Sequence, residues 1–398
     1  MVDTSQFGIS VNDFKCIKRM DAIIERYRNG KIPIEKLSFS VSTKVEVFPW
    51  IDKWLGIAIQ NYVKDLEFGY MDSGYSTLLY LDPLPVFTML TAKSLRKLVL
   101  KDCDLTKATL WSSGSVATYY DSLRELSLLG VRLNDNMLQT LLATCPMIVH
   151  FTIKHCVGLS KIELRNLQMI KMNLKSLKLS CVKISDGFIE HLTSRCEFLE
   201  CLMLDNIVSK GLKRFKVCGR QSLKKLVIRG CNGIAMIDAP NLESLEYVGH
   251  QVPVLKTAKT FGPLKNSRIE LYRVGNLNAL WFCKLRKFLF NSNSLLHITL
   301  HFPKCNKIDM QNWDPYRGLF DIPQIDVLNV HLTGSVKCQT FVDALLWSCH
   351  PGRRNLFSTV QMITCFNIHL MRMRSSTHST SRGSCEPWQC QIKRCSSP

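Results

Sequence analysis

Residues 123–131 read LRELSLLGV, and residues 174–182, 51 positions further along the chain, read LKSLKLSCV. Both stretches have the spacing Leu-x-x-Leu-x-Leu followed three residues later by a small apolar residue. Side chains two positions apart lie on the same face of a strand, so the two leucines of each Leu-x-Leu core share one buried face. The spacing therefore predicts a short strand in each copy.

This spacing recurs along most of the chain at intervals of about 25 residues, which is typical of leucine-rich repeats. Ile148 and Leu199 are also 51 residues apart, which indicates that two coils were repeated together. Regular copies begin at Leu95, Leu123, Ile148, Leu174, Leu199, Leu223 and Leu242, and looser copies begin at Ile34, Val63, Leu295 and Ile325.

A helix is predicted between successive strands. Met137, Leu138, Leu141 and Leu142 have the spacing of one apolar helical face, and Asn134, or Ser185 in the next double repeat, is positioned to cap the first turn. A strand and a helix of this size cannot bury their apolar faces alone, so the units must stack.

The predicted fold is an α/β leucine-rich-repeat solenoid. In this horseshoe, parallel strands line the concave face and helices cover the convex face. An ordinary α/β protein rich in leucine is the alternative, but ten or more near-regular copies with matching helices favour the solenoid.

Four segments are predicted along the chain. Apolar residues from Phe14 to Tyr27 have helical spacing, and further helices are expected at 49–62 and 341–347. The segments are an N-terminal helical lead-in at 1–33, the solenoid at 34–335, the start of a C-terminal region at 336–351, and a basic, disordered tail at 352–398.

The charge balance limits the classes of partner. There are 52 basic and 32 acidic residues, a formal net charge of +20, which attracts anionic partners. No aromatic residues are interleaved with the basic ones on a predicted strand face, so nucleic acid is an unlikely partner. A merely solvated basic surface is the alternative.

The cysteines indicate a reducing compartment. The chain has 17 cysteines, an odd number with no Cys-x-x-Cys pair, and Cys103, Cys156 and Cys231 occupy the small apolar position of a repeat. A buried thiol behaves as a small hydrophobic group. We therefore expect the protein in the cytoplasm or the nucleus.

No catalytic, cofactor or metal motif is found, and the chain is predicted not to be an enzyme. Cys385, Cys390 and Cys395 are five residues apart, whereas paired zinc ligands are usually separated by two to four. The first ten residues lack the pattern of a signal peptide, and no apolar run reaches the roughly 18 residues of a membrane span.

The predicted working surface is the concave face. Residues between and beside the Leu-x-Leu leucines point into it, and we expect exposed apolar anchors with basic residues that select the partner. The alternative is that each of these residues is merely solvated. The candidate partner-binding residues are Lys97, Val99, Lys101, Leu129, Lys154, Lys178, Met203, Lys225, Val227 and Arg229.

Several stretches resemble the plant F-box/leucine-rich-repeat proteins that carry an F-box-associated (FBD) region. The stretches are IPIEKLSF at 32–39, Trp50 and Trp54 leading to VKDLEF at 63–68, AKSLRKL at 92–98, Leu141-Leu142 with Cys145-Pro146, and FVDALLWSCHP at 341–351. The resemblance covers residues 10–351. It implies a substrate receptor of an SCF-type ubiquitin ligase, in which an F-box docks on a Skp-type adaptor and the repeats hold a protein target.

The sequence departs from this family before Ile34. An F-box opens with a Leu-Pro-containing helical segment and contains an Arg-Trp helix, and neither is found there. Binding of a Skp-type adaptor is therefore expected only if an F-box lies upstream. The alternatives are a free-standing repeat protein that binds a partner without a ligase and, more weakly, a basic nucleic-acid-binding repeat protein.

Overall fold

The computed structural model describes most of the chain between Gln6 and Ile368. The described residues are 6–11, 14–42, 48–71, 86–106, 119–168, 170, 173–185, 187–207, 215–219, 222–256, 264–275, 277–292, 297–303, 308–309, 321–333, 338–359, 363–364 and 366–368. The chain forms two compact units, Met1–Lys210 and Gly211–Pro398.

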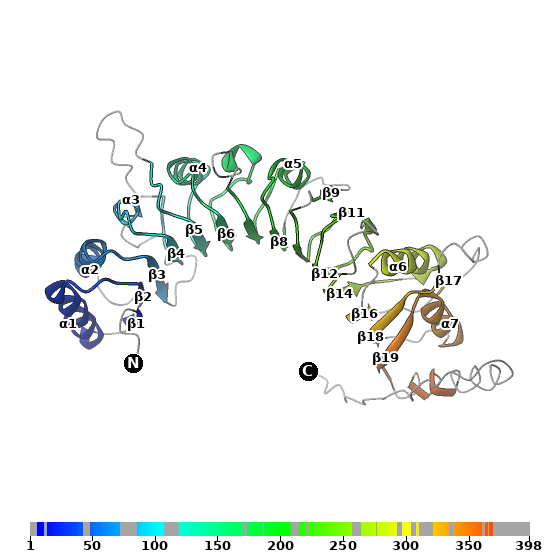
Figure 1. The fold of residues 1–398 in the computed structure, drawn as a ribbon. Coiled ribbons are helices and arrows are strands. Elements are labelled where there is room, and N and C mark those ends of the chain that lie inside the picture. Colours follow the sequence, from blue (N-terminus) through cyan, green and yellow to red (C-terminus); the bar gives the residue numbers. More distant parts are fainter. Residues whose placement is uncertain are drawn as a thin grey trace. The chain divides into compact units, whose positions relative to one another are not determined.

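The first unit is built on parallel strands that lie side by side in chain order (Figure 1). Leu98, Leu126, Phe151, Leu177 and Leu202 lie in register on five adjacent strands, and each is at most 1% exposed. This row confirms the predicted solenoid. The strands are β1 (Gln6–Val11), β2 (Lys36–Ser42), β3 (Asp65–Met71), β4 (Lys97–Lys101), β5 (Glu125–Leu129), β6 (His150–Lys154), β7 (Ser176–Ser180) and β8 (Cys201–Asp205).

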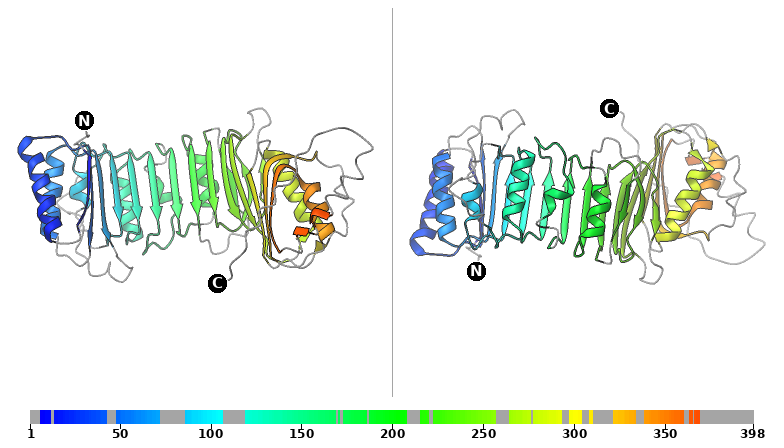
Figure 2. Two further views of the ribbon diagram at one scale, coloured as in Figure 1. Left: turned by 90° about the horizontal axis from the view of Figure 1, so that it is seen from below. Right: turned by 90° about the horizontal axis from the view of Figure 1, so that it is seen from above.

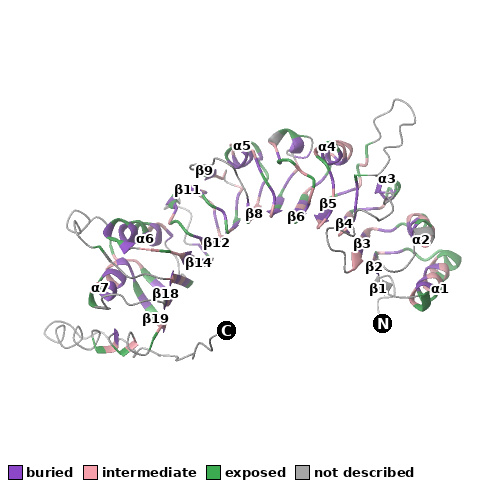
Figure 3. Ribbon diagram, turned by 180° about the vertical axis from the view of Figure 1, so that it is seen from behind, coloured by how far each residue is buried: buried purple, intermediate pink, exposed green. Residues whose placement is uncertain are grey.

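The helices of this unit cover one face of its sheet, as two further views show (Figure 2). They are α1 (Phe14–Gly30), α2 (Phe48–Gln60), α3 (Val86–Leu90), α4 (Asp135–Thr144), the 3-10 helix η2 (Leu164–Leu167) and α5 (Phe188–Arg195). Buried residues follow the strands and the sheet-facing sides of the helices (Figure 3).

One of the two predicted helix caps is confirmed and the other is wrong. The Asn134 side chain accepts a hydrogen bond from the Met137 N–H at 2.8 Å, as its position predicts. Ser185 does not cap α5, because Gly187 stands at the N-cap with φ of 70° and only the Ser185 carbonyl accepts from the Phe188 N–H.

One strand was not expected. β1 pairs with β2 in parallel, so the sheet begins inside the segment predicted as a helical lead-in. Residues 6–11 read QFGISV, and Thr4 stands in the sequence where the repeat has its first apolar residue, three positions before Phe7, so the full repeat spacing is missing.

A repeated left-handed turn follows the strands β4 to β8. Asp102, Gly130, His155, Cys181 and Asn206 each have φ between 48° and 66°. The Gly130 N–H donates to the Lys154 carbonyl at 2.7 Å, and the Asp102 N–H donates to the Leu129 carbonyl at 2.8 Å. The turn thus joins each coil to the next through the backbone.

We expect Gly130→Ala to lower the free energy of unfolding by about 1–2 kcal/mol, because alanine disfavours the left-handed conformation. The new Cβ would also lie 2.0 Å from Asp102 Oδ1, which must move. Gly56→Ala is the matched control: nothing lies within 4 Å of its Cβ in the helix α2, so it should stabilise by roughly 0.5–1 kcal/mol. Urea denaturation measures both, and equal effects would contradict the turn argument.

The second unit is also built on parallel strands and helices, and two smaller sheets accompany its main sheet. Its main sheet has the parallel strands β10 (Lys225–Arg229), β12 (Ser244–Gly249), β14 (Asn266–Tyr272), β16 (His297–Pro303), β18 (Gln324–Thr333) and β19 (His350–Phe357). A second sheet holds β9 (Phe215–Cys218), β11 (Ile234–Asp238) and β13 (Val254–Lys256), and β15 (Leu277–Asn278) pairs with β17 (Ile308–Asp309). The helices are α6 (Ala279–Ser292) and α7 (Cys338–Ser348), and α7 matches the helix predicted at 341–347.

The predicted domain boundaries stay predictions, but the parallel sheet extends past residue 335, where the solenoid was expected to end. The main sheet continues beyond residue 335 into β19, which pairs in parallel with β18 as far as Phe357. Residues 351–354 read PGRR and are poor strand formers, so local preference hides a strand that its neighbour imposes. Residues 369–398 of the predicted disordered tail lie outside the described residues, and the region predicted at 336–351 stays a prediction as a domain boundary.

Candidate functional site

The face of each sheet turned away from the helices is the predicted concave face, and we call it the open face. Strand alternation sends the residues between and beside the core leucines to this face. All ten predicted partner-binding residues occupy such positions, seven in the first unit and three, Lys225, Val227 and Arg229, in the second.

Two of the predicted apolar anchors are not exposed. Val99 is 7% exposed and Val227 is 5% exposed. Each occupies the middle position of its strand, where neighbours in register flank it: Glu67 and Ser127 beside Val99, and Glu246 beside Val227. Both valines therefore support the sheet instead of offering contact area.

Three of the six predicted basic residues are neutralised by acidic residues on a neighbouring strand. Lys97 Nζ lies 2.8 Å from Glu125 Oε1, and Lys101 forms an ion pair with Glu67. Arg229 donates two hydrogen bonds to the Glu246 carboxylate, at 2.9 and 3.0 Å. Half of the predicted basic residues therefore carry compensated charges, and the role of all six in partner binding stays a prediction.

Four predicted residues do lie together, on consecutive strands β5 to β8. Leu129 is in register with Lys154, and Lys178 is in register with Met203. Lys154 is in register with Ser180 and Thr152 with Lys178, so the two lysines are diagonal neighbours. We call Leu129, Lys154, Lys178 and Met203 the lysine strip.

The second unit has a feature that the sequence analysis missed. Tyr272, His301, His331 and Phe357 lie in register on β14, β16, β18 and β19 and stack ring on ring. The ring centroids are 4.3, 4.5 and 4.3 Å apart, and the ring planes are within 18° of parallel. We call these four residues the ring ladder.

Polar side chains hold the ring ladder in place. Glu270 accepts hydrogen bonds from the Tyr272 hydroxyl at 2.5 Å and pairs with His301 Nε2 at 2.9 Å. Burial opposes ionisation of Glu270, but the bond from Tyr272 and the charge of His301 outweigh it and lower the pKa of this carboxyl. Beside the rings, Asn355 Nδ2 donates to Asn329 Oδ1 at 2.8 Å.

The sequence shows half of the signal for the ring ladder, because only Leu300 and Val330, which precede the two histidines, belong to recognised copies of the repeat. Each ladder residue directly follows the second core residue of its strand: Leu271, Leu300, Val330 and Leu356. Aromatic or imidazole side chains at the same position of neighbouring parallel strands must come into contact.

The ring ladder should make stability depend on pH. Burial, and next the charge of His301, lower the pKa of His331 below its ordinary value of 6.5, with Glu270 opposing. The unfolded chain then binds a proton at a higher pH than the folded one, so stability present above pH 6.5 is lost as the pH falls below it. We expect a lower urea midpoint at about pH 5.5 than at pH 7.

His331→Phe is the control for this prediction, because it keeps a ring in the stack and removes the titrating group. It should reduce the difference between the two urea midpoints. It should not abolish it, since burial also lowers the pKa of His350. An unchanged difference in this variant would assign the pH dependence to other groups.

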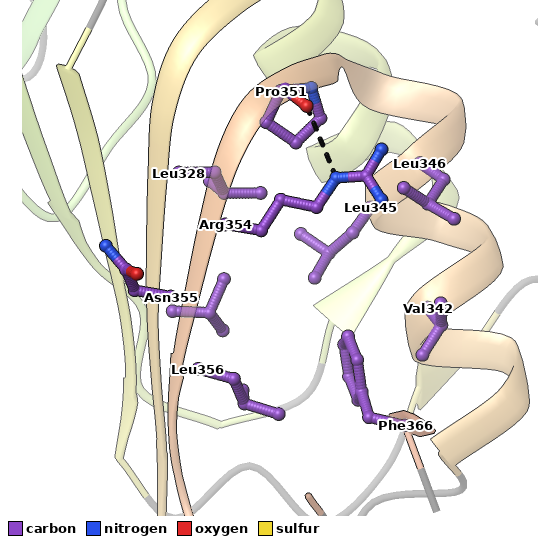
Figure 4. A pocket seen from close by; sticks show the side chains of 10 residues that line it. Leu328, Val342, Leu345, Leu346, Pro351, Arg354, Asn355, Leu356 and Phe366 are labelled. Atoms are coloured by element: carbon purple, nitrogen blue, oxygen red, sulfur yellow. Dashed lines mark hydrogen bonds between the residues drawn. The ribbon is translucent and has the colours of Figure 1, made fainter. Parts of the chain in front are cut away.

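A small apolar pocket lies in the second unit between α7 and the strands β18 and β19 (Figure 4). Leu345, Leu356 and Phe366 face it, and Arg354 Nε donates to the Pro351 carbonyl at 3.3 Å across its rim. Apart from Arg354 and Asn355 the lining is apolar. The pocket therefore offers packing space and no pair of groups for acid–base chemistry.

The buried cysteines act as core residues. Cys103, Cys145, Cys156 and Cys349 are at most 9% exposed. Burial raises the pKa of Cys156 to about 11 and that of Cys145 to about 12, which suppresses their thiolates.

The described part of the chain contains neither a metal-binding cluster nor a membrane-spanning helix. Within the described ranges, no three His, Cys, Asp or Glu side chains are grouped as a metal ion would require. None of the helices in the described part of the chain combines the length and apolar character that a bilayer crossing needs.

The repeats were compared with known proteins. The family model of the FBD-associated F-box protein At5g56370, LRR repeats, matches residues 51–172 and 170–260, which is more than half of the chain. The chain belongs to this F-box/leucine-rich-repeat family. The match confirms the predicted resemblance, and the matched model describes the repeats. A comparison with curated protein sequences finds no match.

Proposed function

We propose that the chain is a protein-interaction scaffold that holds a protein target on its open face. The observation that carries this proposal is the lysine strip, where exposed lysines stand between the partly exposed Leu129 and Met203 on a face without covering helices. Apolar anchors beside charges that select a partner are typical of protein interfaces. Leucine-rich-repeat families typically act as scaffolds without catalysis, and no enzymatic role is proposed.

The finer proposal is that this scaffold is the substrate-recognition part of an SCF-type ubiquitin ligase. Membership of the FBD-associated F-box family supports it. In that arrangement an F-box joins the repeats to a Skp-type adaptor, and ubiquitin transfer occurs on other subunits. The many cysteines support a reducing compartment, the cytoplasm or the nucleus.

Affinity capture from cells with matched variants tests the scaffold proposal. The Leu129→Ser/Met203→Ser variant should lose proteins that the wild-type chain captures. The control is Met147→Ser/Phe198→Ser, which removes apolar side chains that are 40% and 52% exposed and lie outside the open face. Retention of the same proteins by both variants would place binding elsewhere.

Co-purification with a Skp-type adaptor tests the ligase role. Retention of the adaptor by the 398-residue chain supports assembly into an SCF-type complex. Failure to retain it rejects direct assembly and favours the second candidate, a free-standing repeat protein that binds its partner without a ligase.

A further inference from the structure

On strands β2 to β5, acidic and basic side chains on the open face compensate one another. Lys36, Asp65, Lys97 and Glu125 follow one another in register on β2 to β5, with alternating sign. Lys97 pairs with Glu125, and Lys101 pairs with Glu67. Opposite charges on neighbouring strands stabilise a sheet, and like charges destabilise it.

The lysine strip breaks this alternation. Lys154 and Lys178 are exposed, and neither forms an ion pair with any residue that the structure describes. Asp205 on β8 is a diagonal neighbour of Lys178, but its carboxylate accepts hydrogen bonds from the Ser180 hydroxyl and from Asn206 and forms no ion pair with that lysine. The two lysines therefore lie close together without an ion pair.

The surroundings of the two lysines leave them accessible. Their neighbours on the open face are the small polar residues Ser127, Thr152, Ser176 and Ser180. Diagonal neighbours on adjacent strands are roughly 7–8 Å apart, which is close to the spacing of about 6.8 Å between alternate side chains of an extended peptide. Leu129 and Met203 bound the pair on its two sides.

We propose that the lysine strip binds an acidic segment of the protein target, with two carboxylates at alternate positions between apolar side chains. This inference rests on the proposed function and specifies the chemistry of the partner. The carboxylates pair with Lys154 and Lys178, and the apolar side chains pack on Leu129 and Met203.

A protein segment is favoured over nucleic acid by the side chains around the lysine strip. Among the described open-face positions of β2 to β8 there is no Phe, Tyr or Trp on which a base could stack. Single-stranded nucleic acid binding generally requires such stacking platforms along a basic groove. Leu129 and Met203 instead offer contact to aliphatic side chains.

Fluorescence anisotropy with a labelled peptide tests the proposal. The probe has leucine at both ends, glutamate at the third and fifth of seven positions, and serine elsewhere. The wild-type chain should bind it, and added salt should weaken binding. K154E/K178E should weaken it on the order of 10-fold or more, because two attractions become repulsions. K183E is the control, with one Lys→Glu reversal at an exposed lysine outside the open face, and should bind as the wild type does.

A second peptide, with lysine in place of both glutamates, tests whether the charges determine binding. It should bind K154E/K178E better than it binds the wild-type chain. The proposal is overturned if the acidic peptide does not bind, if K154E/K178E binds it as tightly as K183E does, or if a single-stranded oligonucleotide binds in preference to the peptide. If only these tests fail while Leu129→Ser/Met203→Ser still loses captured proteins, the scaffold proposal stands and the acidic partner is rejected.

Discussion

Leu177→Asp should abolish cooperative folding of the first unit. Leu177 is fully buried between Phe151 and Leu202 in the central row of the solenoid. Removing a buried leucine costs about 2–5 kcal/mol, and burying a carboxylate without a partner adds several more. The expected loss exceeds about 5 kcal/mol, which equals the whole stability of many domains.

The control for Leu177→Asp introduces the same group one residue further on. Lys178→Asp places the carboxylate on the open face, where a surface change typically alters stability by at most about 0.5 kcal/mol. Circular dichroism during urea denaturation and hydrogen exchange across β6, β7 and β8 measure the two variants. If Leu177→Asp kept the exchange protection of β6 and β8, the stacking argument would be wrong, because each repeat depends on its neighbours.

Sequence alone predicted the core of the solenoid because periodicity determines it. Leucines with a period of two fix which strand face is buried, and the helical spacing after Asn134 fixes which helix face meets it. Neither inference requires knowledge of contacts distant in sequence. The equivalent positions of successive copies, Leu98, Leu126, Phe151, Leu177 and Leu202, therefore form one row in the structure.

Periodicity could not show which charged side chains form ion pairs. Whether Lys101 is free depends on Glu67, which is 34 residues away and becomes its neighbour only when β3 pairs with β4. The spacing identified Lys101 and Lys154 as equivalent positions. Only the side chains on adjacent strands distinguish the neutralised lysine from the uncompensated one.

The ring ladder required a register that the sequence concealed. Repeat spacing weakens between residues 253 and 293, and β19 contains a proline, a glycine and two arginines. Tyr272 and Phe357 lie beside the two histidines only because β14 pairs with β16 and β19 pairs with β18. Parallel pairing, set by the whole sheet, brings the four rings together.

Trp54→Ala should destabilise the first unit by about 3–5 kcal/mol, the usual cost of removing a large aromatic side chain from a core. Trp54 is fully buried on α2, and its ring packs edge-on against Phe39, with centroids 5.9 Å apart. Phe39 in turn packs against Phe68, with centroids 5.1 Å apart. The truncation would leave a cavity between the helix α2 and the strands β2 and β3.

Trp54→Phe separates the aromatic packing from the hydrogen bond of the indole. Trp54 Nε1 donates to Asp21 Oδ1 at 3.1 Å, and Lys53 Nζ still lies 2.7 Å from that oxygen when the indole is removed. The carboxylate therefore keeps a partner, and Trp54→Phe should cost only about 1–2 kcal/mol for the lost bond and the smaller ring. Urea denaturation of both variants measures the difference. Equal losses would mean that the bond to Asp21 on α1, and not the aromatic packing against β2 and β3, accounts for the contribution of Trp54 to stability.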